Sequence, residues 1–448
     1  MKVLLISPNT LTVPYPVYPI GLDYVAGCLA AEHQVEIADL NIIDREGLAS
    51  LLLDFSPDII GLSLRNVDNT EIETPLFFIE EYKELVAWLR ARSQAVLVCG
   101  GAGFTILPQE IFAALDLDYG IIGEGERFGL LVDALANKHS LSDIPGLLSH
   151  SGPAQVPAPW TGKQQRHVPR STAHYQFYLD HGGMLNLQTK RGCSFRCIYC
   201  PYPHIEGKTQ RLLPPDEVAR TALGLEQAGA KYFFITDSIF NSDIGHSLAV
   251  AKAFQQCGVS IPWGGFFAPL KLPKGYFKTM HEAGLKHVEF GTESLCRKML
   301  QNYRKPFQPE DVLTAHRQAL DAELHVAHYF LMGGPGESEN TVQETLTNIA
   351  SLNKTVLFFF TGIRIYPHTA LYDLALAEDQ ISATTDLLKP VFYESDAITH
   401  QAIEKAILHQ AGKRINWIVG SGGTEAAATV SKMHQRGYTG PLWEYLIR

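Results

Sequence analysis

The sequence predicts an α/β protein made of a doubly wound, Rossmann-like domain, a partial (β/α)6 barrel and a mostly helical C-terminal extension. Three observations support this fold class. Short apolar runs of strand length alternate with helical stretches, as in parallel sheets that are covered by helices. The chain has 448 residues, which is too long for one ordinary core. A proline-rich stretch with little periodicity separates two βα series.

The boundaries follow from the changes in this pattern. We expect the Rossmann-like domain at 1–148, a linker at 149–180, the barrel at 181–376 and the extension at 377–448. The expected strands of the first domain are Val3–Ser7, Gln34–Ala38, Asp58–Leu64, Ala95–Cys99 and Tyr119–Ile122. Those of the barrel are Met184–Thr189, Tyr232–Thr236, Ile261–Phe267, His287–Gly291, His325–Met332 and Leu357–Tyr366. Most are nearly continuous apolar runs, which predicts sheets buried on both faces.

Composition narrows the class of protein. The formal net charge is −10, whereas nucleic-acid binders usually carry a basic excess, so no nucleic-acid partner is expected. No signal-peptide pattern and no apolar run of the roughly 20 residues that span a bilayer is found. We therefore expect a cytoplasmic protein whose seven cysteines are reduced. Four of them are scattered along the chain and are expected to be buried small side chains: Cys28, Cys99, Cys257 and Cys296.

The other three cysteines are clustered in the segment KRGCSFRCIYCPYP. Cys193, Cys197 and Cys200 have CxxxCxxC spacing directly after an expected strand. Thiolates suit iron–sulfur clusters, which normally take four protein ligands. Three ligands leave one iron open, and an open iron can bind the amino and carboxylate groups of S-adenosylmethionine (SAM). The motif therefore predicts a [4Fe–4S] cluster that cleaves SAM, with the chemistry supplied by the cofactors.

Other interpretations of these cysteines fit less well. A structural zinc site needs four ligands, and His204 is a poor fourth at this spacing. A redox Cys-x-x-Cys pair would use Cys197 and Cys200 and leave Cys193 unexplained. Chance clustering of three of the seven cysteines within eight residues is improbable.

With Tyr199 before its last cysteine, the motif resembles that of the radical SAM superfamily. Segments after later strands agree with the family, namely TDSIF at 236–240, FGTES at 290–294, MGGPGE at 332–337 and RIYPHT at 364–369. The resemblance implies SAM contacts from Tyr199, Asp237, Ser238, Glu293, Ser294, Gly333, Gly334, Pro335 and Tyr366. Alone, each segment also fits a tight turn or a helix cap. All of them follow strands, on the face where barrel active sites form.

The first domain is expected to bind a ligand beyond its strand ends, where the strand order reverses. With a flavodoxin-like order, that crevice lies between the first and third strands. The loops there are long or rich in glycine, at 8–19, 64–70, 100–103 and 123–126. No G-x-G-x-x-G follows the first strand, so NAD or FAD is not supported.

These loops resemble those of the cobalamin-binding domain that precedes many radical SAM enzymes. The matching segments are PxGLxYVAGxL (Pro19–Leu29), GGAGF and DYGIIGEGE (Asp118–Glu126). The resemblance implies cobalamin contacts from Tyr15, Tyr18, Arg65, Asn66, Asp68, Gly100, Gly101, Ala102, Gly103, Gly123, Glu124 and Gly125. The D-x-H-x-x-G signature is absent. Cobalamin would then bind without a histidine from this motif, or the domain no longer binds it.

Arg65 ends the third expected strand and is a candidate for the lower face of the corrin. A guanidinium has no lone pair for a metal, so it would lie near cobalt without coordinating it. The alternative is a surface arginine paired with Asp68.

Taken together, these patterns resemble the cobalamin-dependent radical SAM enzyme family, and most closely a subgroup associated with lipid biosynthesis. The resemblance implies a methyltransferase that methylates an unactivated carbon of a small molecule or lipid, with SAM, the [4Fe–4S] cluster and methylcobalamin. An external electron donor such as a flavodoxin or ferredoxin is expected. One alternative is a cyclase, rearrangement or C–C bond-forming enzyme without net methyl transfer. Another is a non-catalytic cofactor-binding protein. The C-terminal extension is expected to cap the barrel mouth or to pack on its outside.

Overall fold

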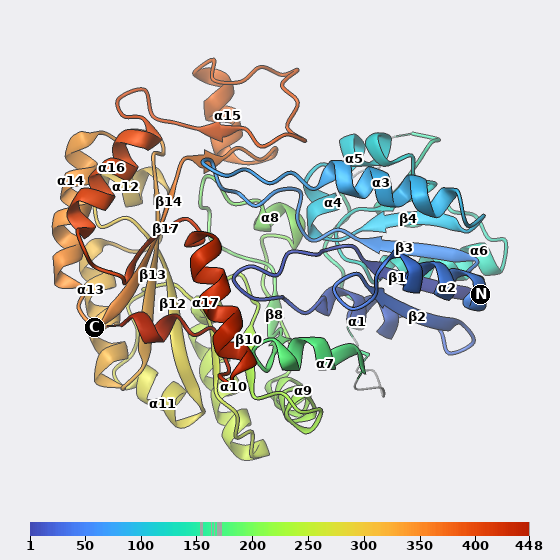
Figure 1. Ribbon diagram of the computed structural model, residues 1–448, viewed down its shortest axis with the longest axis horizontal. Helices are drawn as coiled ribbons and strands as arrows, with labels where there is room; N and C mark the ends of the chain where they lie inside the picture. The colour runs from blue at the N-terminus through green and yellow to red at the C-terminus, as the bar shows by residue number, and fades with distance from the viewer. Residues whose placement is uncertain (153–155, 163, 165, 168–172, 448) are drawn as a thin grey trace.

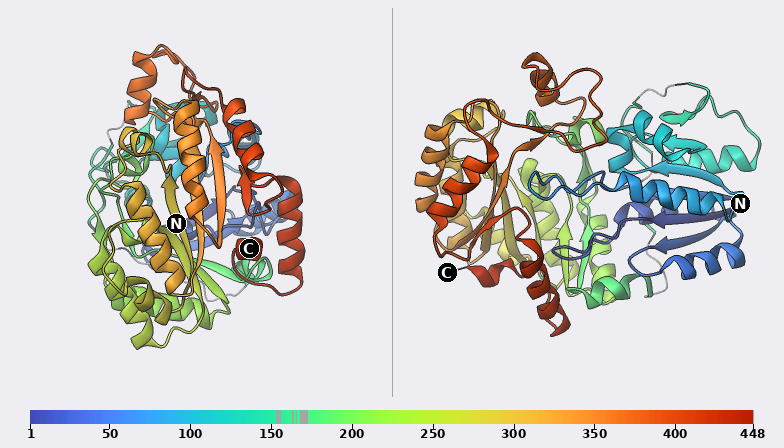
Figure 2. Two further views of the ribbon diagram at one scale, coloured as in Figure 1. Left: turned by 90° about the vertical axis from the view of Figure 1, so that its left-hand side faces the viewer. Right: turned by 45° about the horizontal axis from the view of Figure 1, so that its top comes forward.

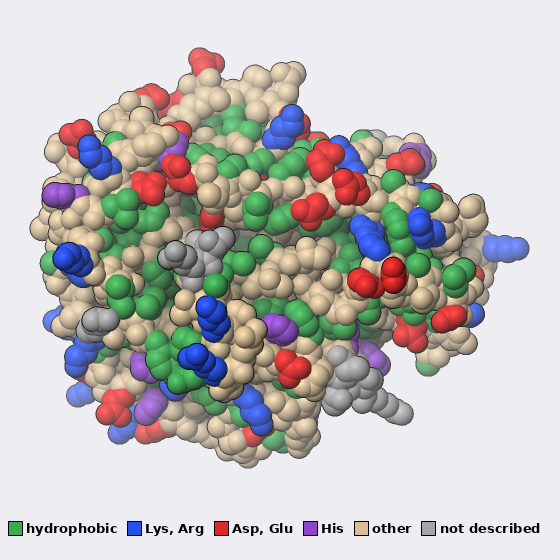
Figure 3. Space-filling view, in the orientation of Figure 1, with side chains coloured by type: hydrophobic (Ala, Val, Ile, Leu, Met, Phe, Trp, Pro, Cys, Tyr) green, Lys and Arg blue, Asp and Glu red, His purple; other side chains and the backbone are tan. Residues whose placement is uncertain are grey.

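The computed structural model describes residues 1–152, 156–162, 164, 166–167 and 173–447, and it shows two α/β bodies lying side by side (Figure 1). The first body contains the N-terminus, and the second is the barrel. The predicted linker, 149–180, includes residues outside the described part, among them Pro153 and Pro169. On the face drawn in Figure 3, Lys and Arg side chains are interspersed with Asp and Glu.

The first sheet has the order β2-β1-β3-β4-β5-β6, which confirms the flavodoxin-like expectation. Its strands are β1 (Lys2–Ser7), β2 (Gln34–Asp39), β3 (Ile59–Ser63), β4 (Val96–Gly100), β5 (Tyr119–Ile121) and β6 (Leu147–Ser149). All neighbours pair in parallel except β6, which runs antiparallel to β5. The order therefore reverses between β1 and β3, where the crevice was expected.

Helices cover both faces of this sheet, because its strands are apolar on both sides. On one face, α1 (Ile20–Gly27) and α6 (Arg127–Ala136) pack against Val3, Leu5 and Ile59. The other face is covered by α2 (Arg45–Phe55), α3 (Ile79–Arg90) and α5 (Pro108–Leu115). The helix expected at Ile20–Ala31 is shorter than predicted and ends at Gly27.

The second sheet has seven parallel strands in the order β17-β14-β13-β12-β11-β10-β7. They are β7 (Met184–Leu187), β10 (Tyr232–Ile235), β11 (Trp263–Phe267), β12 (Leu285–Glu293), β13 (His325–Met332), β14 (Thr355–Thr361) and β17 (Trp417–Val419). The helices between them lie outside the curved sheet, as in a barrel: α9 (Pro215–Gln227), α10 (Ile244–Cys257), α11 (Tyr276–Glu282), α13 (Pro309–Asp321), α14 (Glu339–Asn348) and α16 (His400–Ala411) (Figure 1). The sheet remains open between β17 and β7.

Two features of the C-terminal part differ from the sequence prediction. The strand expected at 357–366 is interrupted at Gly362, whose φ of 71° turns the chain into the separate β15 (Ile363–Arg364). The extension is not only helical, because its short β17 adds a seventh strand to the barrel. After β17, α17 (Gly423–Gln435) leads the chain back to the β7 edge, where the Gly440 amide donates to the Gly182 carbonyl at 2.9 Å.

The C-terminal tail therefore covers the end of the barrel opposite its mouth. The extension was expected either to cap the mouth or to pack on the outside of the barrel, and this arrangement is neither. Trp443 Nε1 donates to Glu289 Oε1 at 3.0 Å, and Glu444 lies 3.3 Å from His287 Nε2, both near the start of β12.

Two loops of the first body, 8–19 and 64–78, extend toward the barrel in Figures 1 and 2.

In the described part of the chain, no helix has both the length and the apolar character that crossing a bilayer requires.

Candidate cofactor site

The cysteine motif lies in a loop at the mouth of the barrel. It follows β8 (Lys190–Arg191), which pairs with β9 (Arg211–Leu212). Gly192 has a φ of 83°, and a Cβ there would lie 2.2 Å from the Thr209 carbonyl oxygen, so the turn into Cys193 requires glycine. The Cys193 amide donates to the Gly207 carbonyl, and the Cys200 amide donates to that of Cys197. The chain is thus folded back so that the three cysteines lie in one compact loop.

The three thiols influence one another, as expected for side chains that face a common space. Burial raises the pKa of Cys200 to about 12, and the charges of Cys197 and Cys193 add to this shift. Among the described residues, no three His, Cys, Asp or Glu side chains converge tightly enough for a single metal ion. Cluster thiolates bind different irons, so their sulfurs lie further apart than the ligands of one ion. Three thiolates in one loop therefore fit three irons of a [4Fe–4S] cluster.

His204 is the residue that was considered above as a fourth zinc ligand. Its ring stacks on that of His368, with centroids 4.2 Å apart and planes 13° from parallel. Burial lowers the pKa of His204 to about 4, so the ring is neutral at pH 7.

A buried lysine that was not predicted lies beside the cysteines. Lys305 Nζ is 3.0 Å from Glu293 Oε1 and 3.2 Å from the Tyr199 hydroxyl, which itself donates to Glu293 at 2.8 Å. Burial alone would lower the pKa of Lys305, but Glu293 and the Cys197 thiol reverse this and raise it. Lys305 therefore stays charged. This group brings together Tyr199 and Glu293, both predicted SAM contacts.

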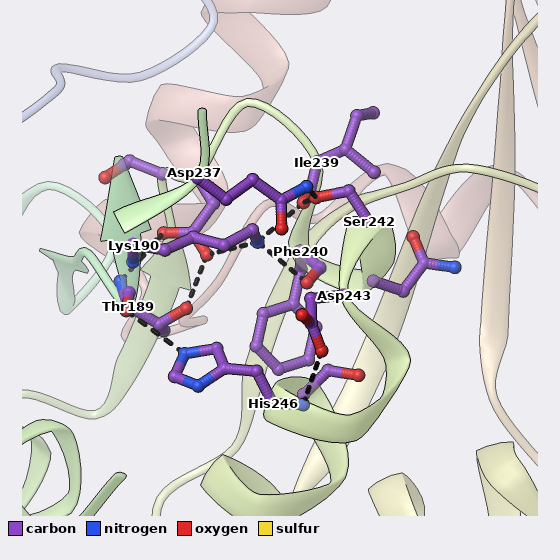
Figure 4. A network of polar contacts seen from close by, with 12 residues as sticks. Thr189, Lys190, Asp237, Ile239, Phe240, Ser242, Asp243 and His246 are labelled. Atoms are coloured by element: carbon purple, nitrogen blue, oxygen red, sulfur yellow. Dashed lines mark hydrogen bonds and ion pairs between the residues drawn. The ribbon is translucent and has the colours of Figure 1, made fainter. Parts of the chain in front are cut away.

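Asp237, another predicted SAM contact, is held by the strand that leads to the cysteines (Figure 4). Its carboxylate accepts hydrogen bonds from the Thr189 amide at 2.7 Å and from Lys190 Nζ at 2.9 Å. Lys190 is fully buried and also donates to the Ile239 and Phe240 carbonyls, at 2.7 and 2.8 Å. Asp237 thus fixes the approach to Cys193 from the loop after β10, and its role toward SAM stays a prediction.

The other predicted SAM residues lie at strand ends but differ in what they contact. Ser238 lines a cavity, whereas Ser294 is buried and its hydroxyl is 2.9 Å from that of Thr345. The turn at Gly333, Gly334 and Pro335 packs tightly, since a Cβ at Gly334 would lie 2.3 Å from the Tyr303 ring. Tyr366 packs against the core of the first body, 3.5 Å from Asp68.

The cavity lies between the two bodies and has a volume of about 510 Å³. The carboxyl ends of strands from both sheets meet there, because Ser63 and Gly101 line it from one side and Thr236 from the other. Its lining includes these predicted cobalamin residues: Tyr18, Arg65, Gly101, Ala102, Gly123, Glu124 and Gly125. Tyr15, Asn66, Asp68, Gly100 and Gly103 do not line it. On the face drawn in Figure 3, the surface is hollowed near its centre, where the two bodies meet.

Close packing of the backbone explains why one residue that lines the cavity, Gly101, is a glycine. Gly101 has a φ of 98°, and a Cβ there would lie 2.5 Å from the Leu64 carbonyl oxygen. The turn after β4 therefore requires glycine, and it leaves backbone exposed to the cavity. Backbone of this kind allows a large planar ligand to approach closely, as cobalamin would.

Arg65 extends into the cavity, where its side chain is exposed. Asp68 is instead paired with Arg364 of β15, whose Nε lies 2.7 Å from Asp68 Oδ2. The alternative of an Arg65–Asp68 pair is therefore wrong. No hydrogen bond or ion pair of Arg65 is found within the described ranges. Desolvation lowers the pKa of Arg65, and Tyr202 and Tyr15 act in the opposite direction. An unpaired cation at this edge of the cavity agrees with the prediction that Arg65 lies next to the corrin.

Glu124 is held by the cysteine hairpin. Its Oε1 is 3.1 Å from Arg191 Nη1 and 2.5 Å from Arg211 Nη1, and all three side chains are largely buried. Arg191 also contacts Glu126 at 2.7 Å. Charged contacts thus join the turn after β5 of the first body to the β8–β9 hairpin that flanks the cysteine loop. The group of Glu124, Arg191 and Arg211 acts as an interdomain clasp.

Comparison with known families agrees with this geometry. Residues 6–129 match the model of the B12 binding domain, and residues 187–349 match that of the radical SAM superfamily. This chain is a radical SAM protein with a B12-binding domain. Its cofactors are accordingly SAM, a [4Fe–4S] cluster and cobalamin.

Similar proteins of known sequence or structure share this architecture. An uncharacterised methyltransferase of Pyrococcus horikoshii is 26% identical over 404 residues, which cover 85% of this chain and 84% of that protein. The tryptophan 2-C-methyltransferase of Streptomyces laurentii is 24% identical over 446 residues, covering 82% and 73%. The structure of TsrM from Kitasatospora setae, with tryptophan substrate and a SAM analogue bound, matches 99% of this chain and 97% of its own at a TM-score of 0.86 and 21% identity.

Sequence reasoning missed several residues of this site. No role was predicted for Lys190, Arg191 or Lys305, because each acts through a pairing that the sequence does not mark, with Asp237, Glu124 and Glu293 respectively. The one available signal was that Lys190 and Arg191 directly precede Gly192 and Cys193.

Proposed function

We propose that this protein is a cobalamin-dependent radical SAM methyltransferase that methylates an unactivated carbon of a small molecule or lipid. The observation that carries the proposal is that residues on both sides of the cysteine loop, Arg191 and Tyr202, line the same interdomain cavity as the strand ends of the B12-binding domain. The names of the similar proteins in Pyrococcus horikoshii and Streptomyces laurentii, both methyltransferases, support it.

The cysteine loop would hold the cluster through Cys193, Cys197 and Cys200. The Gly192 turn and the buried Lys190–Asp237 pair fix the approach of the chain to Cys193. Lys305, Glu293 and Tyr199 form a charged, hydrogen-bonded group beside the thiols, where they would orient the amino and carboxylate groups of SAM. Lys305 also places a positive charge next to thiolates that carry negative charge, which favours their ionised form.

The crevice between β1 and β3 would hold cobalamin. Gly101 and Gly123 would let the corrin lie close to the backbone, and Arg65 would place a cation beneath it without coordinating the metal. The clasp between Glu124, Arg191 and Arg211 fixes the distance between this crevice and the cysteine loop. With both cofactors bound, the position of the cavity between the two bodies would shield the reacting groups from bulk water, which limits side reactions.

When bound, the cluster supplies an electron for cleavage of SAM, and cobalamin carries the methyl group. The electron must come from outside, so a flavodoxin or ferredoxin is part of this proposal. A cytoplasmic location, where thiols stay reduced, is also part of it.

The test is anaerobic reconstitution of the full chain with iron, sulfide and cobalamin, followed by mass analysis of products formed from candidate small molecules and lipids. With SAM that carries a deuterated methyl group, a methyltransferase gives a product heavier by one labelled methyl. A cyclase or rearrangement enzyme gives a product without the label. A fully loaded protein that neither cleaves SAM nor alters any candidate would point to a non-catalytic role.

A further inference from the structure

The inside of the barrel is lined by aromatic rings directly below the cofactor site. Side chains of a strand alternate between its two faces, and the inward positions include Phe234 on β10, Phe266 on β11, Tyr329 on β13, and Phe358 and Phe360 on β14. Phe266 meets Phe234 and Tyr329 edge to face, with centroids 5.1 and 6.1 Å apart. Tyr329 lies nearly parallel to Phe358 and Phe360, at 4.8 and 6.4 Å.

This aromatic lumen is open toward the cavity between the two bodies. Phe266 is 38% exposed although it belongs to an internal strand of the sheet, and it lines that cavity. Gly291 occupies an inward position on β12, beside Tyr329 on β13. The nearest atom that a Cβ at Gly291 would meet is Glu293 Oε1, at 3.4 Å, so there is room for a group between these residues.

A carboxyl group forms the floor of the lumen. Glu289 is buried on β12, one inward position below Gly291, and accepts hydrogen bonds from the Tyr329 hydroxyl at 2.9 Å and from Trp443 Nε1 at 3.0 Å. Both carboxyl oxygens are thus engaged, and the Tyr329 ring is held in place from below. Tyr15, on the loop that enters from the first body, packs against Phe234 at the side.

We propose that this lumen is the substrate pocket and that it binds a planar aromatic ring of the substrate against Phe266, Tyr329 and Phe360. The proposal rests on the proposed function and deepens it, since it names the chemical class of the methyl acceptor. The acceptor carbon would then lie between the floor at Glu289 and the group of Glu293, Lys305 and Tyr199 above it.

Two features favour a flat aromatic ring over a flexible chain, and a third restricts its charge. Ring faces and edges are both presented to the lumen, and aromatic pairs prefer these offset-stacked and edge-to-face arrangements. The rings are held rigidly, because Tyr329 is hydrogen-bonded and stacked, so the pocket selects shape. The carboxyl of Glu289 disfavours a buried anion next to it, which indicates that the ring portion of the substrate is neutral.

The test uses the full chain and calorimetric titration with 2-naphthol, a neutral planar probe. Decahydro-2-naphthol is the matched control, because it has the same skeleton and hydroxyl without aromatic faces. Dodecanoate, below its micellar concentration, represents a lipid chain. The proposal predicts saturable binding of 2-naphthol and at least about five-fold weaker binding of the other two, since aromatic contacts add to area burial. Equal binding of the saturated probe or stronger binding of dodecanoate would overturn it.

Variants locate the binding in the lumen. Phe266→Ala should weaken 2-naphthol binding by about three- to ten-fold through the loss of one aromatic contact, and Gly291→Val should abolish it by filling the space beside Tyr329. Leu53→Ala is the control, because Leu53 is 78% exposed on α2, and it should bind like the wild type. Unchanged binding in both lumen variants would place the probe elsewhere and refute the pocket.

Binding of 2-naphthol is measured without methyl transfer, so the two proposals fail separately. A protein that transfers methyl groups but does not bind the probe contradicts only the aromatic pocket. A protein that binds the probe in the lumen but yields unlabelled products contradicts only the methyltransferase.

Discussion

Arg364 and Asp68 form a buried ion pair 2.7 Å long, although 296 residues separate them in the chain. Arg364 belongs to β15 at the barrel mouth, and Asp68 belongs to the loop that follows β3 in the B12-binding domain. Arg364 also donates to the carbonyls of Ile365 and Leu387, so its guanidinium is well satisfied. The pair anchors the loop that carries Arg65 and leaves Arg65 free to face the cavity.

Loss of this pair should destabilise the protein. Arg364→Met leaves the Asp68 carboxylate buried without its cation, which typically costs about 3 to 5 kcal/mol. The free energy of unfolding in urea at pH 7 measures this loss. The double variant Asp68→Leu/Arg364→Met should recover most of it, because no charge is left buried.

Lys83→Met provides the comparison, since Lys83 and its partner Glu80 lie on the surface, where ion pairs contribute little. If Arg364→Met unfolded at the same urea concentration as Lys83→Met, the Asp68 pair would have no anchoring role.

Each of Cys193→Ala, Cys197→Ala and Cys200→Ala should abolish the cluster and SAM cleavage, because a cluster with three protein ligands cannot lose one of them. Iron and sulfide content after anaerobic reconstitution, together with SAM cleavage, are the measurements. Cys28→Ala and Cys257→Ala are matched controls at half-buried cysteines distant in sequence from the motif, and their iron content should equal that of the wild type. Equal iron loss in these controls would contradict the assignment of the cluster ligands.

Glu289 should make stability depend on pH. Burial raises its pKa from 4.5 to about 7. Between these values the unfolded chain releases the proton while the folded protein retains it, so rising pH favours the unfolded state. The free energy of unfolding should therefore fall by up to about 3 kcal/mol from pH 4.5 to pH 7, at 1.36 kcal/mol per pKa unit, and then level off.

Glu289→Gln isolates this effect because it cannot ionise. Any loss of hydrogen bonding to Tyr329 and Trp443 shifts its stability by a constant amount. The difference between wild type and variant, measured by urea unfolding from pH 4.5 to 8, should follow the titration of one group. A difference that does not vary with pH would mean that burial does not raise the pKa of Glu289.

Much of the fold could be predicted because a strand is marked by an apolar run of residues that are neighbours in the sequence. Val3–Ser7 and His325–Met332 are apolar runs, and they form β1 and β13. In contrast, β17 has three half-buried residues and no periodicity to detect. Gly362 lay inside an apolar run, and nothing in that run indicated its positive φ.

The site was predictable where it depends on spacing and not where it depends on distant pairs. The cysteines follow one another closely, so their pattern was visible. Lys305 pairs with Glu293 across a segment that contains the short helix α12 (Arg297–Asn302), and Arg364 contacts Asp68 only where the two domains meet. Sequence periodicity carries no information on contacts of this kind, so the alternative interpretation paired Asp68 with Arg65 and did not consider Arg364.

Arg65 should influence which ligands the cobalt of bound cobalamin can take. Within the described residues Arg65 has no hydrogen-bond or ion-pair partner, and it faces the cavity from the end of β3. Because a guanidinium cannot coordinate a metal, it should keep strong ligands away from the lower face of cobalt. Arg65→His introduces an imidazole, which can coordinate, whereas Arg65→Leu removes the charge and adds no ligand.

Arg65→His should therefore change the absorption spectrum of bound cobalamin and slow turnover, while Arg65→Leu should keep the wild-type spectrum. The full chain should bind about one cobalamin in each case, and iron content should be unchanged, because Arg65 lies in the loop after β3 and not in the cysteine loop. The spectrum is the decisive measurement, since a purely structural arginine would alter stability without altering the ligands of cobalt. If the histidine variant bound cobalamin with the wild-type spectrum and turned over normally, Arg65 would not lie beneath the corrin.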